Sequence, residues 1–321
     1  MKHPLCLLAA LLLAALCACR GAPSPAESPA PAASAVNPAT TLTFTDDLGR
    51  EVTAPAPPQR VAALLGSYAD VWCLAGGQGT LAAAAHDAWT DFALDLGDGV
   101  ADLGGLLEPN LEALIAAEPD FVIASSNTAA HLELQDALAE LGIPVAYFDV
   151  NSFADYLAML QTCTMLTGRD DLYQQNGLDV QAQVDAAKAR ADGSAPTVLV
   201  LRAAGSSCKV KNSRGTVLGE LLADLGAVNI ADSDTQLLED LSLERILADD
   251  PDCIFVVYQG DDEAAAQRTL QAALTANPAW NTLTAVQQGR FYVMDKQPFH
   301  LKPNARWGEA YRQAADLLYG G

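Results

Sequence analysis

The sequence has 321 residues, of which 50% are hydrophobic, and its 40 acidic residues against 18 basic ones give a formal net charge of −22 at pH 7. This charge excludes a protein that holds nucleic acid or an anionic membrane by its surface, because both are polyanions. About 280 residues follow the first 40, which is enough for two ordinary domains with sizeable cores.

The first residues have the pattern of an export signal. Lys2 precedes an apolar run over 5–16 that is too short to cross a bilayer as a helix, which needs about 20 apolar residues. The run ends in LCAC at 16–19, which resembles the bacterial lipobox. By that resemblance, residues 1–18 are a lipoprotein signal peptide and Cys19 is lipidated; cleavage without lipidation is the alternative. We therefore expect an exported protein, anchored by lipid to the outer face of the cell membrane or periplasmic.

Residues 19–40 follow as the lipidated cysteine and a tether rich in proline and alanine. The segment has no apolar pattern able to bury surface, so it is expected to be extended. Such a tether holds a globular domain clear of a membrane.

An N-terminal lobe is expected over 41–151. It begins with a hairpin whose strands lie at 41–44 and 50–53. Short apolar runs then alternate with helical patterns, which is typical of an α/β domain with a mostly parallel sheet. The expected strands are 61–65, 81–85, 121–124 and 145–148, and the expected helices are 67–75, 110–117 and 129–141.

The pattern changes over 152–192, where there is no strand signal and no proline, only helical periodicity with one weak point at Gly168. This predicts one long linking helix, or two nearly continuous ones. Alternation resumes over 193–321, the expected C-terminal lobe. Its predicted strands are 197–202, 253–258 and 291–294, and its predicted helices are 216–225, 243–249, 263–275 and 304–319. The predicted fold is thus two similar α/β lobes joined by one long rigid helix.

A short repeat relates the two lobes. Residues 111–123 read LEALIAAEPDFVI and residues 243–255 read LERILADDPDCIF, with leucine, glutamate, alanine, proline and aspartate coinciding at a constant offset of 132. Each copy follows a good helix N-cap, Asn110 or Ser242, and each helix stops before a proline and leads into a strand. Both lobes are therefore expected to contain the same helix-turn-strand unit.

These features together resemble the periplasmic-type substrate-binding lipoproteins of iron-siderophore, haem and cobalamin ABC importers. The resemblance covers about residues 42–319 and depends on the order of FTDDLGREV, PAPPQRVAAL, the two repeated segments, the helical region and NPAW…LTAVQQGRFYVM. It implies a ligand cleft between two α/β lobes. It also implies a solute-binding lipoprotein that delivers an iron complex, a siderophore-type chelate, to an ABC importer. Haem and cobalamin remain alternatives, and a divalent-metal binder or an α/β enzyme is a weaker one.

The resemblance assigns a role to the repeated glutamates. In this family a glutamate on each lobe docks onto arginines of the permease dimer, and Glu112 and Glu244 stand at the matching positions. One exposed carboxylate per lobe suits a two-fold symmetric transporter. The alternative is structural, since a glutamate in the first turn of a helix is favoured by the helix dipole.

A cleft wall is expected in the C-terminal lobe, because ligands bind beyond the carboxyl ends of parallel strands. The segments 202–214 and 296–306 contain seven of the 18 lysines and arginines, together with His300. This concentration of positive charge suits an anionic ligand. The alternative is that the lysines are solvated loop residues with no role in binding. The candidate ligand-binding residues are Tyr68, Trp89, Arg202, Lys209, Lys211, Tyr258, His300, Lys302 and Arg306, the aromatic ones for the flat faces of a chelate.

No metal site and no cofactor are expected, the ligand itself being an iron chelate. His86, His131 and His300 lack the spacing of a metal site, although His300 as a hydrogen-bonding group or as a ligand to iron stays open. The segment 76–79 does not fit GxGxxG, and no other motif asks for catalysis. We therefore expect a monomeric binding protein and no enzyme. Which chelate is bound is not decided by the sequence.

Overall fold

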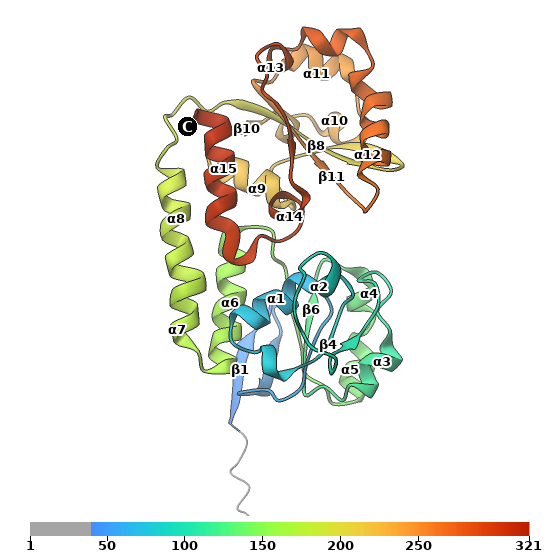
Figure 1. Cartoon of the computed structure of the whole chain (residues 1–321), viewed down its shortest axis with the longest axis vertical. Coiled ribbons are helices and arrows are strands. Elements are labelled where there is room, and N and C mark those ends of the chain that lie inside the picture. Colours follow the sequence, from blue (N-terminus) through green and yellow to red (C-terminus); the bar gives the residue numbers. More distant parts are fainter. Residues whose placement is uncertain (1–39, 321) are drawn as a thin grey trace, which may run out of the picture. The chain divides into compact units, whose positions relative to one another are not determined.

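The computed structural model describes residues 40–320 and has an α/β fold (Figure 1). The predicted signal peptide, Cys19 and almost all of the tether lie outside the described residues and stay predictions. The predicted α/β class with mostly parallel sheets is confirmed.

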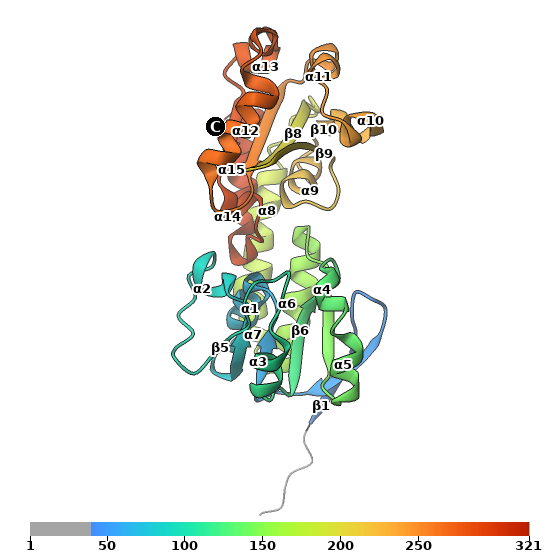
Figure 2. The ribbon, with the colours of Figure 1, turned by 90° about the vertical axis from the view of Figure 1, so that its right-hand side faces the viewer.

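The chain begins with the expected hairpin, β1 (Thr41–Thr45) and β2 (Glu51–Pro55), which pair antiparallel. Its turn is organised by the buried Asp46, whose carboxylate accepts hydrogen bonds from the backbone N–H groups of Leu48 and Arg50 and from the Arg50 guanidinium. The hairpin lies at the end of the N-terminal lobe that faces away from the C-terminal lobe (Figures 1 and 2).

The N-terminal lobe contains a fully parallel sheet in the order β5-β4-β3-β6-β7. Its strands are β3 (Val61–Ala63), β4 (Leu81–Ala84), β5 (Ala101–Asp102), β6 (Phe121–Ser125) and β7 (Val145–Phe148). Its helices are α1 (Gly66–Leu74), α2 (Asp87–Thr90), α3 (Leu111–Ala116), α4 (Ala129–Leu132) and α5 (Gln135–Glu140). Strands β3, β4, β6 and β7 are almost entirely buried, which explains why continuous apolar runs predicted them. The short β5 is partly exposed and was not predicted.

The single helix expected over 129–141 is wrong, since α4 and α5 are separate. The carbonyl of His131, which a continuous helix would use for its own i to i+4 bond, instead accepts from the Tyr147 hydroxyl at 2.9 Å and from the N–H of Leu134. A tertiary contact thus ends the first helix.

The one long linking helix is also wrong: the segment forms two helical arms. The first, α6 (Phe153–Thr167), has a capping box at Ser152 and ends at Gly168, whose φ of 71° is left-handed. The second consists of α7 (Asp170–Tyr173), a π turn (Gln174–Leu178) and α8 (Asp179–Lys188).

The two arms are antiparallel, because the Tyr156 hydroxyl near the start of α6 donates to the carbonyl of Asn176 at 2.7 Å. Only the second arm passes between the lobes. The Asn176 amide donates to the carbonyl of Leu74 in α1, and Lys188 forms an ion pair at 2.6 Å with Asp224 of the C-terminal lobe. Figure 1 shows this arm beside α6 and α15.

The C-terminal lobe has a mixed sheet in the order β10-β8-β11-β12, with β9 antiparallel to β8. Its strands are β8 (Thr197–Ala204), β9 (Ser207–Lys211), β10 (Val228–Asn229), β11 (Cys253–Tyr258) and β12 (Phe291–Met294). Its helices are α9 (Val217–Asp224), α10 (Thr235–Glu239), α11 (Leu243–Asp249), α12 (Glu263–Leu270), α13 (Thr284–Gln287), α14 (Lys296–Phe299) and α15 (Trp307–Tyr319). The expected loop over 202–214 is therefore largely a hairpin of β8 and β9.

The predicted repeat has a structural cause. Glu118 and Asp250, which are 132 residues apart, end their helices with left-handed φ angles of 46° and 38°. Two residues later, the Asp120 carboxylate accepts from the N–H of Arg60 at 2.9 Å, and Asp252 accepts from the N–H of Thr197 at 2.8 Å. Each aspartate thereby ties its helix-turn-strand unit to the start of the neighbouring strand. The two lobes are similar, as predicted.

One hydrophobic core continues from the N-terminal lobe through the helical arms into the C-terminal lobe. It includes Phe121 of β6, Phe153 of α6, Val184 of α8, Phe255 of β11 and Trp307 of α15. The Phe153 and Trp307 rings meet edge to face with their centroids 6.3 Å apart. Two smaller cores cover the other faces of the two sheets. Because the connection is packed, we expect the lobes to move little on ligand binding.

Candidate functional site

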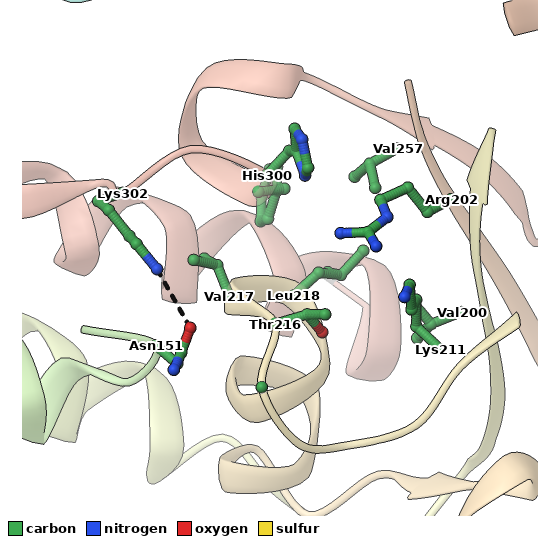
Figure 3. Close-up of a pocket in the computed structure, with 12 residues that line it drawn as sticks. Asn151, Val200, Arg202, Lys211, Thr216, Val217, Leu218, Val257, His300 and Lys302 are labelled. Atoms are coloured by element: carbon green, nitrogen blue, oxygen red, sulfur yellow. Dashed lines mark hydrogen bonds between the residues drawn. The ribbon is translucent and has the colours of Figure 1, made fainter. Parts of the chain in front are cut away.

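A basic pocket of about 140 Å³ lies at the face of the C-terminal lobe that contacts the N-terminal lobe (Figure 3). It is formed by the hairpin β8–β9, the start of α9, the end of β11 and the segment after α14. The lining residues are Asn151, Val200, Arg202, Lys211, Gly215, Thr216, Val217, Leu218, Val257, Phe299, His300 and Lys302. All but Asn151 belong to the C-terminal lobe.

The hairpin aligns its cations by register. Arg202 of β8 stands opposite Lys209 of β9, and Val200 stands opposite Lys211, so all four side chains share one face of the sheet. Burial lowers the pKa of Arg202. Burial is also the main cause that lowers the pKa of Lys211, and the neighbouring charges of Arg202 and Lys209 lower it further. The pocket therefore concentrates positive charge that the protein itself does not neutralise.

The segment after α14 supplies two further groups. Burial, aided by the charges of Arg202, Lys296 and Lys302, lowers the pKa of His300 to about 4, so this imidazole is neutral at pH 7. Burial lowers the pKa of Lys302 to about 8, although Asp149 and Asp155 oppose the shift. In Figure 3 the ammonium of Lys302 reaches the Asn151 side chain, with Nζ and Oδ1 3.1 Å apart.

The start of α9 forms the floor of the pocket. Thr216 caps the helix by accepting from the N–H of Gly219 at 3.2 Å. A Cβ at Gly219 would lie 2.4 Å from the carbonyl oxygen of Asn212, so only glycine lets the preceding loop fold against the helix. The partial positive charge of a helix N-terminus adds to that of the side chains.

Two more contacts join the lobes around the pocket. Lys296 of α14 lies 3.2 Å from a carboxylate oxygen of Asp91 and 3.4 Å from one of Asp261. These two carboxylates raise the pKa of Lys296 even though its burial acts in the opposite direction. The buried Asn304 donates through its amide to the carbonyl of Ser67 at 2.9 Å and to the carboxylate of Asp70 at 2.8 Å, both in α1.

The structure brings Arg202, Lys211, His300 and Lys302 together, as the sequence predicted. Lys209 faces the same side of the hairpin but is exposed and does not line the pocket.

Other predicted ligand contacts lie elsewhere. Tyr68 is 1% exposed in the core of the N-terminal lobe, and its hydroxyl donates to the carbonyl of Phe148. Tyr258 follows Val257 in β11 and therefore points to the opposite face of the sheet, where it lines a different cavity. For these two tyrosines the prediction of a cleft contact is wrong.

Trp89 and Arg306 are also outside the pocket. Trp89 is half-buried against the core of the N-terminal lobe. Arg306 is exposed. Burial raises the pKa of Asp70, and the charge of Arg306 partly opposes this shift.

Three groups in or beside the pocket were not among the predicted ligand contacts. Asn151 lies three residues after the end of β7, so the rule of strand carboxyl ends would have included it. Thr216 precedes an apolar helical pattern and has the sequence signature of an N-cap. Lys296 was counted among the basic residues of its loop, but only the structure brings it to Asp91.

The two repeated glutamates are exposed, as their predicted role requires. Each lies in the first turn of its helix, Glu112 in α3 behind the cap Asn110 and Glu244 in α11 behind the cap Ser242. Contact with a permease is untested and stays a prediction.

Two similar α/β lobes with a polar pocket where they meet define a solute-binding protein. The chain belongs to the periplasmic binding protein family, whose model matches residues 61–298. It is similar to the iron-uptake system-binding protein of Bacillus subtilis, with 26% identity over 65% of each chain. It is also similar to the vitamin B12-binding protein of Pectobacterium carotovorum, with 26% identity over 71% of this chain and 83% of the relative.

Among solved structures, the fold resembles that of Staphylococcus aureus SirA complexed with staphyloferrin B. The TM-score is 0.67 and the identity 21%, over 87% of this chain and 97% of that one. These relatives are binding proteins, and this chain is a binding protein rather than an enzyme, as predicted. Within residues 40–320, no helix combines the length and the apolar character needed to cross a membrane.

Proposed function

We propose that this protein is an extracytoplasmic lipoprotein that binds an anionic iron chelate of the siderophore type and delivers it to an ABC importer. The observation that carries the proposal is the group of half-buried cations in the pocket, Arg202, Lys211 and Lys302. Among the described residues, neither Arg202 nor Lys211 has an acidic partner at ion-pair distance, in a chain whose net charge is −22. Partial removal of an unpaired charge from water already costs free energy, as the lowered pKa values of Arg202 and Lys211 indicate, so the pocket suits an anion from outside.

The geometry favours a ligand with carboxylate or catecholate groups. A guanidinium binds such groups with two parallel hydrogen bonds, and Lys211 and Lys302 add point charges beside it. The cavity of about 140 Å³ admits an anionic arm, whereas whole small-molecule sites are typically about 300–1,000 Å³. The remainder of the chelate would then contact the N-terminal lobe.

The similarity to a protein of an iron-uptake system supports iron as the cargo, while the similarity to a vitamin B12-binding protein keeps a corrinoid as the alternative. Haem, whose carboxylates also suit the pocket, is the other alternative. A bare divalent ion has less support, because residues 40–320 contain no group of three or more acidic, histidine or cysteine residues able to hold one.

The delivery step rests on two further proposals. Lipid at Cys19 would keep the monomer at the membrane surface, and Glu112 and Glu244 would register its two lobes on the permease dimer. The equivalence of the two glutamates in the repeat and their exposure support this arrangement.

Titration of the soluble domain with a panel of ligands tests the proposal. Tryptophan fluorescence and native mass spectrometry would be recorded with ferric carboxylate, catecholate and hydroxamate complexes, haemin and cyanocobalamin. We expect an anionic iron complex to bind, and Arg202→Gln to weaken it at least tenfold. The matched control is Arg214→Gln, which removes an exposed arginine of the same basic segment, 202–214. Binding of none of these ligands, or equal effects of the two variants, would overturn the proposal.

A further inference from the structure

A second cavity lies where four helices from different parts of the fold meet. It has a volume of about 440 Å³ and is lined by the start of α6, by α8, by α9 and by Tyr311 of α15. Figure 1 shows where these four helices run. The basic pocket measures about 140 Å³, and whole small-molecule sites are typically about 300–1,000 Å³. This second cavity, which we call the α9 cavity, is therefore large enough for a complete small molecule.

Two aromatic side chains line the α9 cavity. The rings of Phe153 and Tyr311 meet edge to face, with their centroids 6.5 Å apart. Burial raises the pKa of Tyr311, and the hydrogen bond to Asp224 and the charge of Glu220 raise it further. The phenol therefore stays protonated, and its hydroxyl donates to Asp224 at 2.7 Å. Neutral aromatic rings beside carboxylates are a combination that suits organic cations, which bind over ring faces.

The charges of the α9 cavity do not balance. Both carboxylate oxygens of Asp224 have partners, since one lies 2.6 Å from the ammonium of Lys188 and the other accepts from Tyr311. Glu220 accepts from the N–H of Gly215 at 3.0 Å, but no cation within residues 40–320 lies at ion-pair distance from it. The cavity is thus lined by two carboxylates and one ammonium.

Helix stability does not explain this pair of carboxylates. Glu220 and Asp224 are four residues apart on α9, a spacing at which like charges destabilise a helix. Asp224 also lies in the last turn of α9, where the helix dipole disfavours a negative charge. A cation from outside the protein would offset both of these costs.

Helix α9 also connects this cavity to the basic pocket. Gly215, whose N–H donates to Glu220, lines the basic pocket together with Thr216 and Val217 at the start of the helix. A cation that binds Glu220 competes with this N–H for the carboxylate. The N–H then becomes available to an anion in the basic pocket. Each of the two sites therefore favours occupation of the other.

We propose that the α9 cavity is a second ligand site, which binds a small organic ammonium ion beside the Phe153 and Tyr311 rings and the Glu220 carboxylate. The ion carries apolar substituents, because Leu157 and Val184 also line the cavity. Its binding raises the affinity of the basic pocket for an anion through α9. The site itself goes beyond the proposed function, and only the link through α9 rests on that function.

Choline is the probe for this site, and the control ligand is its neutral carbon isostere, in which a tert-butyl group replaces the trimethylammonium group. We expect ligand-observed NMR titration of the purified protein to show at least about tenfold tighter binding of choline. Glu220→Gln keeps an acceptor for the Gly215 N–H but removes the charge, and should weaken choline binding by about tenfold. Asp185→Asn, which neutralises an exposed aspartate of α8 outside the cavity, is the matched control and leaves choline binding unchanged.

A variant that fills the cavity gives an independent measurement. Ala223→Phe places a ring in the cavity that Ala223 lines and changes no charge, so choline binding should be lost. Ala182→Phe adds the same ring at an exposed position of α8 and should have no effect. Absence of choline binding, equal affinities for choline and its isostere, equal effects of the two charge variants, or choline binding that survives in Ala223→Phe would overturn the inference.

The link through α9 is measured with the anionic iron complex that binds the wild-type protein. At saturating choline the affinity for this complex should rise by about fivefold, and Glu220→Gln should remove the rise. An affinity that choline leaves unchanged overturns the link. If no iron complex binds the wild-type protein, the proposed function fails, and the choline titration still decides the second site.

Discussion

Lys296 and Asp91 join the two lobes by an ion pair, with Nζ and a carboxylate oxygen 3.2 Å apart and both side chains more than two-thirds buried. The same ammonium lies 3.4 Å from Asp261, whose side chain is 99% exposed. One lysine thus has a shielded partner in the other lobe and a solvated partner in its own lobe. Because solvent screens exposed charges, the shielded pair should carry most of the interaction.

A double-mutant cycle between Lys296→Met and Asp91→Asn is expected to give a coupling energy of about 1 kcal/mol in urea unfolding. The parallel cycle with Asp261→Asn, the matched control, should give no measurable coupling. Equal couplings in the two cycles would contradict the idea that the pair with Asp91 holds the lobes together.

Asn304 forms another interlobe contact, and its φ of 51° is left-handed. Asn304→Ala removes its bonds to Ser67 and Asp70 and places an alanine in a conformation that disfavours it. We expect a loss of about 2–4 kcal/mol in the free energy of unfolding. Asn304→Gly removes the same bonds without the backbone cost and should be about 1 kcal/mol more stable than Asn304→Ala. If the two variants unfold at the same urea concentration, the backbone of residue 304 is not strained.

His300 should make stability depend on pH. Its pKa is about 4 in the folded protein and about 6.5 in the unfolded chain. Between these values the unfolded state binds more protons, so the free energy of unfolding rises with pH. The contribution of His300 to stability is lost as the pH falls from 6.5 towards 4. We therefore expect the difference in the free energy of unfolding between His300→Asn and the wild type to depend on pH. It should favour the variant by on the order of 2 kcal/mol more near pH 4 than at pH 7.

The measurement is urea unfolding at several pH values, taken as the difference between variant and wild type. This difference cancels the contribution of His131, whose pKa burial also lowers to about 4. A difference that does not change with pH would mean that His300 is protonated alike in both states.

The sheets were predictable from the sequence because buried parallel strands are continuous apolar runs. For the same reason the sequence did not predict which side chains occupy which face of the sheet. In CIFVVY of β11 every residue is apolar, so nothing in the sequence decided whether Val257 or Tyr258 faces the ligand. A shift of one residue reverses the face. The prediction that Tyr68 contacts the ligand was wrong for a different reason. Tyr68 lies in a helix whose buried side is set by packing.

The helical arms were misread because Gly168 is compatible with two structures. A glycine inside a helical pattern is tolerated, and it is also the best residue to end a helix in the left-handed conformation. What decides is the packing of Gly177 against Leu157 and Leu160, which requires the second arm to fold back on the first. Arg202 and His300, in contrast, do lie together in the pocket, because the rule of strand ends and the local excess of cations do not depend on packing. Their contact with a ligand stays a prediction.

The paired glutamates give the last prediction. Both Glu112 and Glu244 are exposed, lie in the first turn of equivalent helices and make no side-chain contact with the ligand pocket. The double variant Glu112→Ala with Glu244→Ala should therefore bind the chelate with unchanged affinity in fluorescence titration. The free energy of unfolding should fall by no more than about 2 kcal/mol, since each of the two first-turn carboxylates contributes at most about 1 kcal/mol.

Uptake of the radiolabelled iron complex by cells that depend on this protein should nevertheless be abolished, because the carboxylates would no longer register the two lobes on the permease. Each single variant should retain partial uptake, since one lobe still docks. The matched control is Glu140→Ala with Asp249→Ala, which removes one exposed acidic residue from each lobe and leaves the charge of the protein the same as in the test variant. Reduced ligand affinity in the test variant, or an equal loss of uptake in the control, would refute a docking role and favour the purely structural role of a first-turn glutamate.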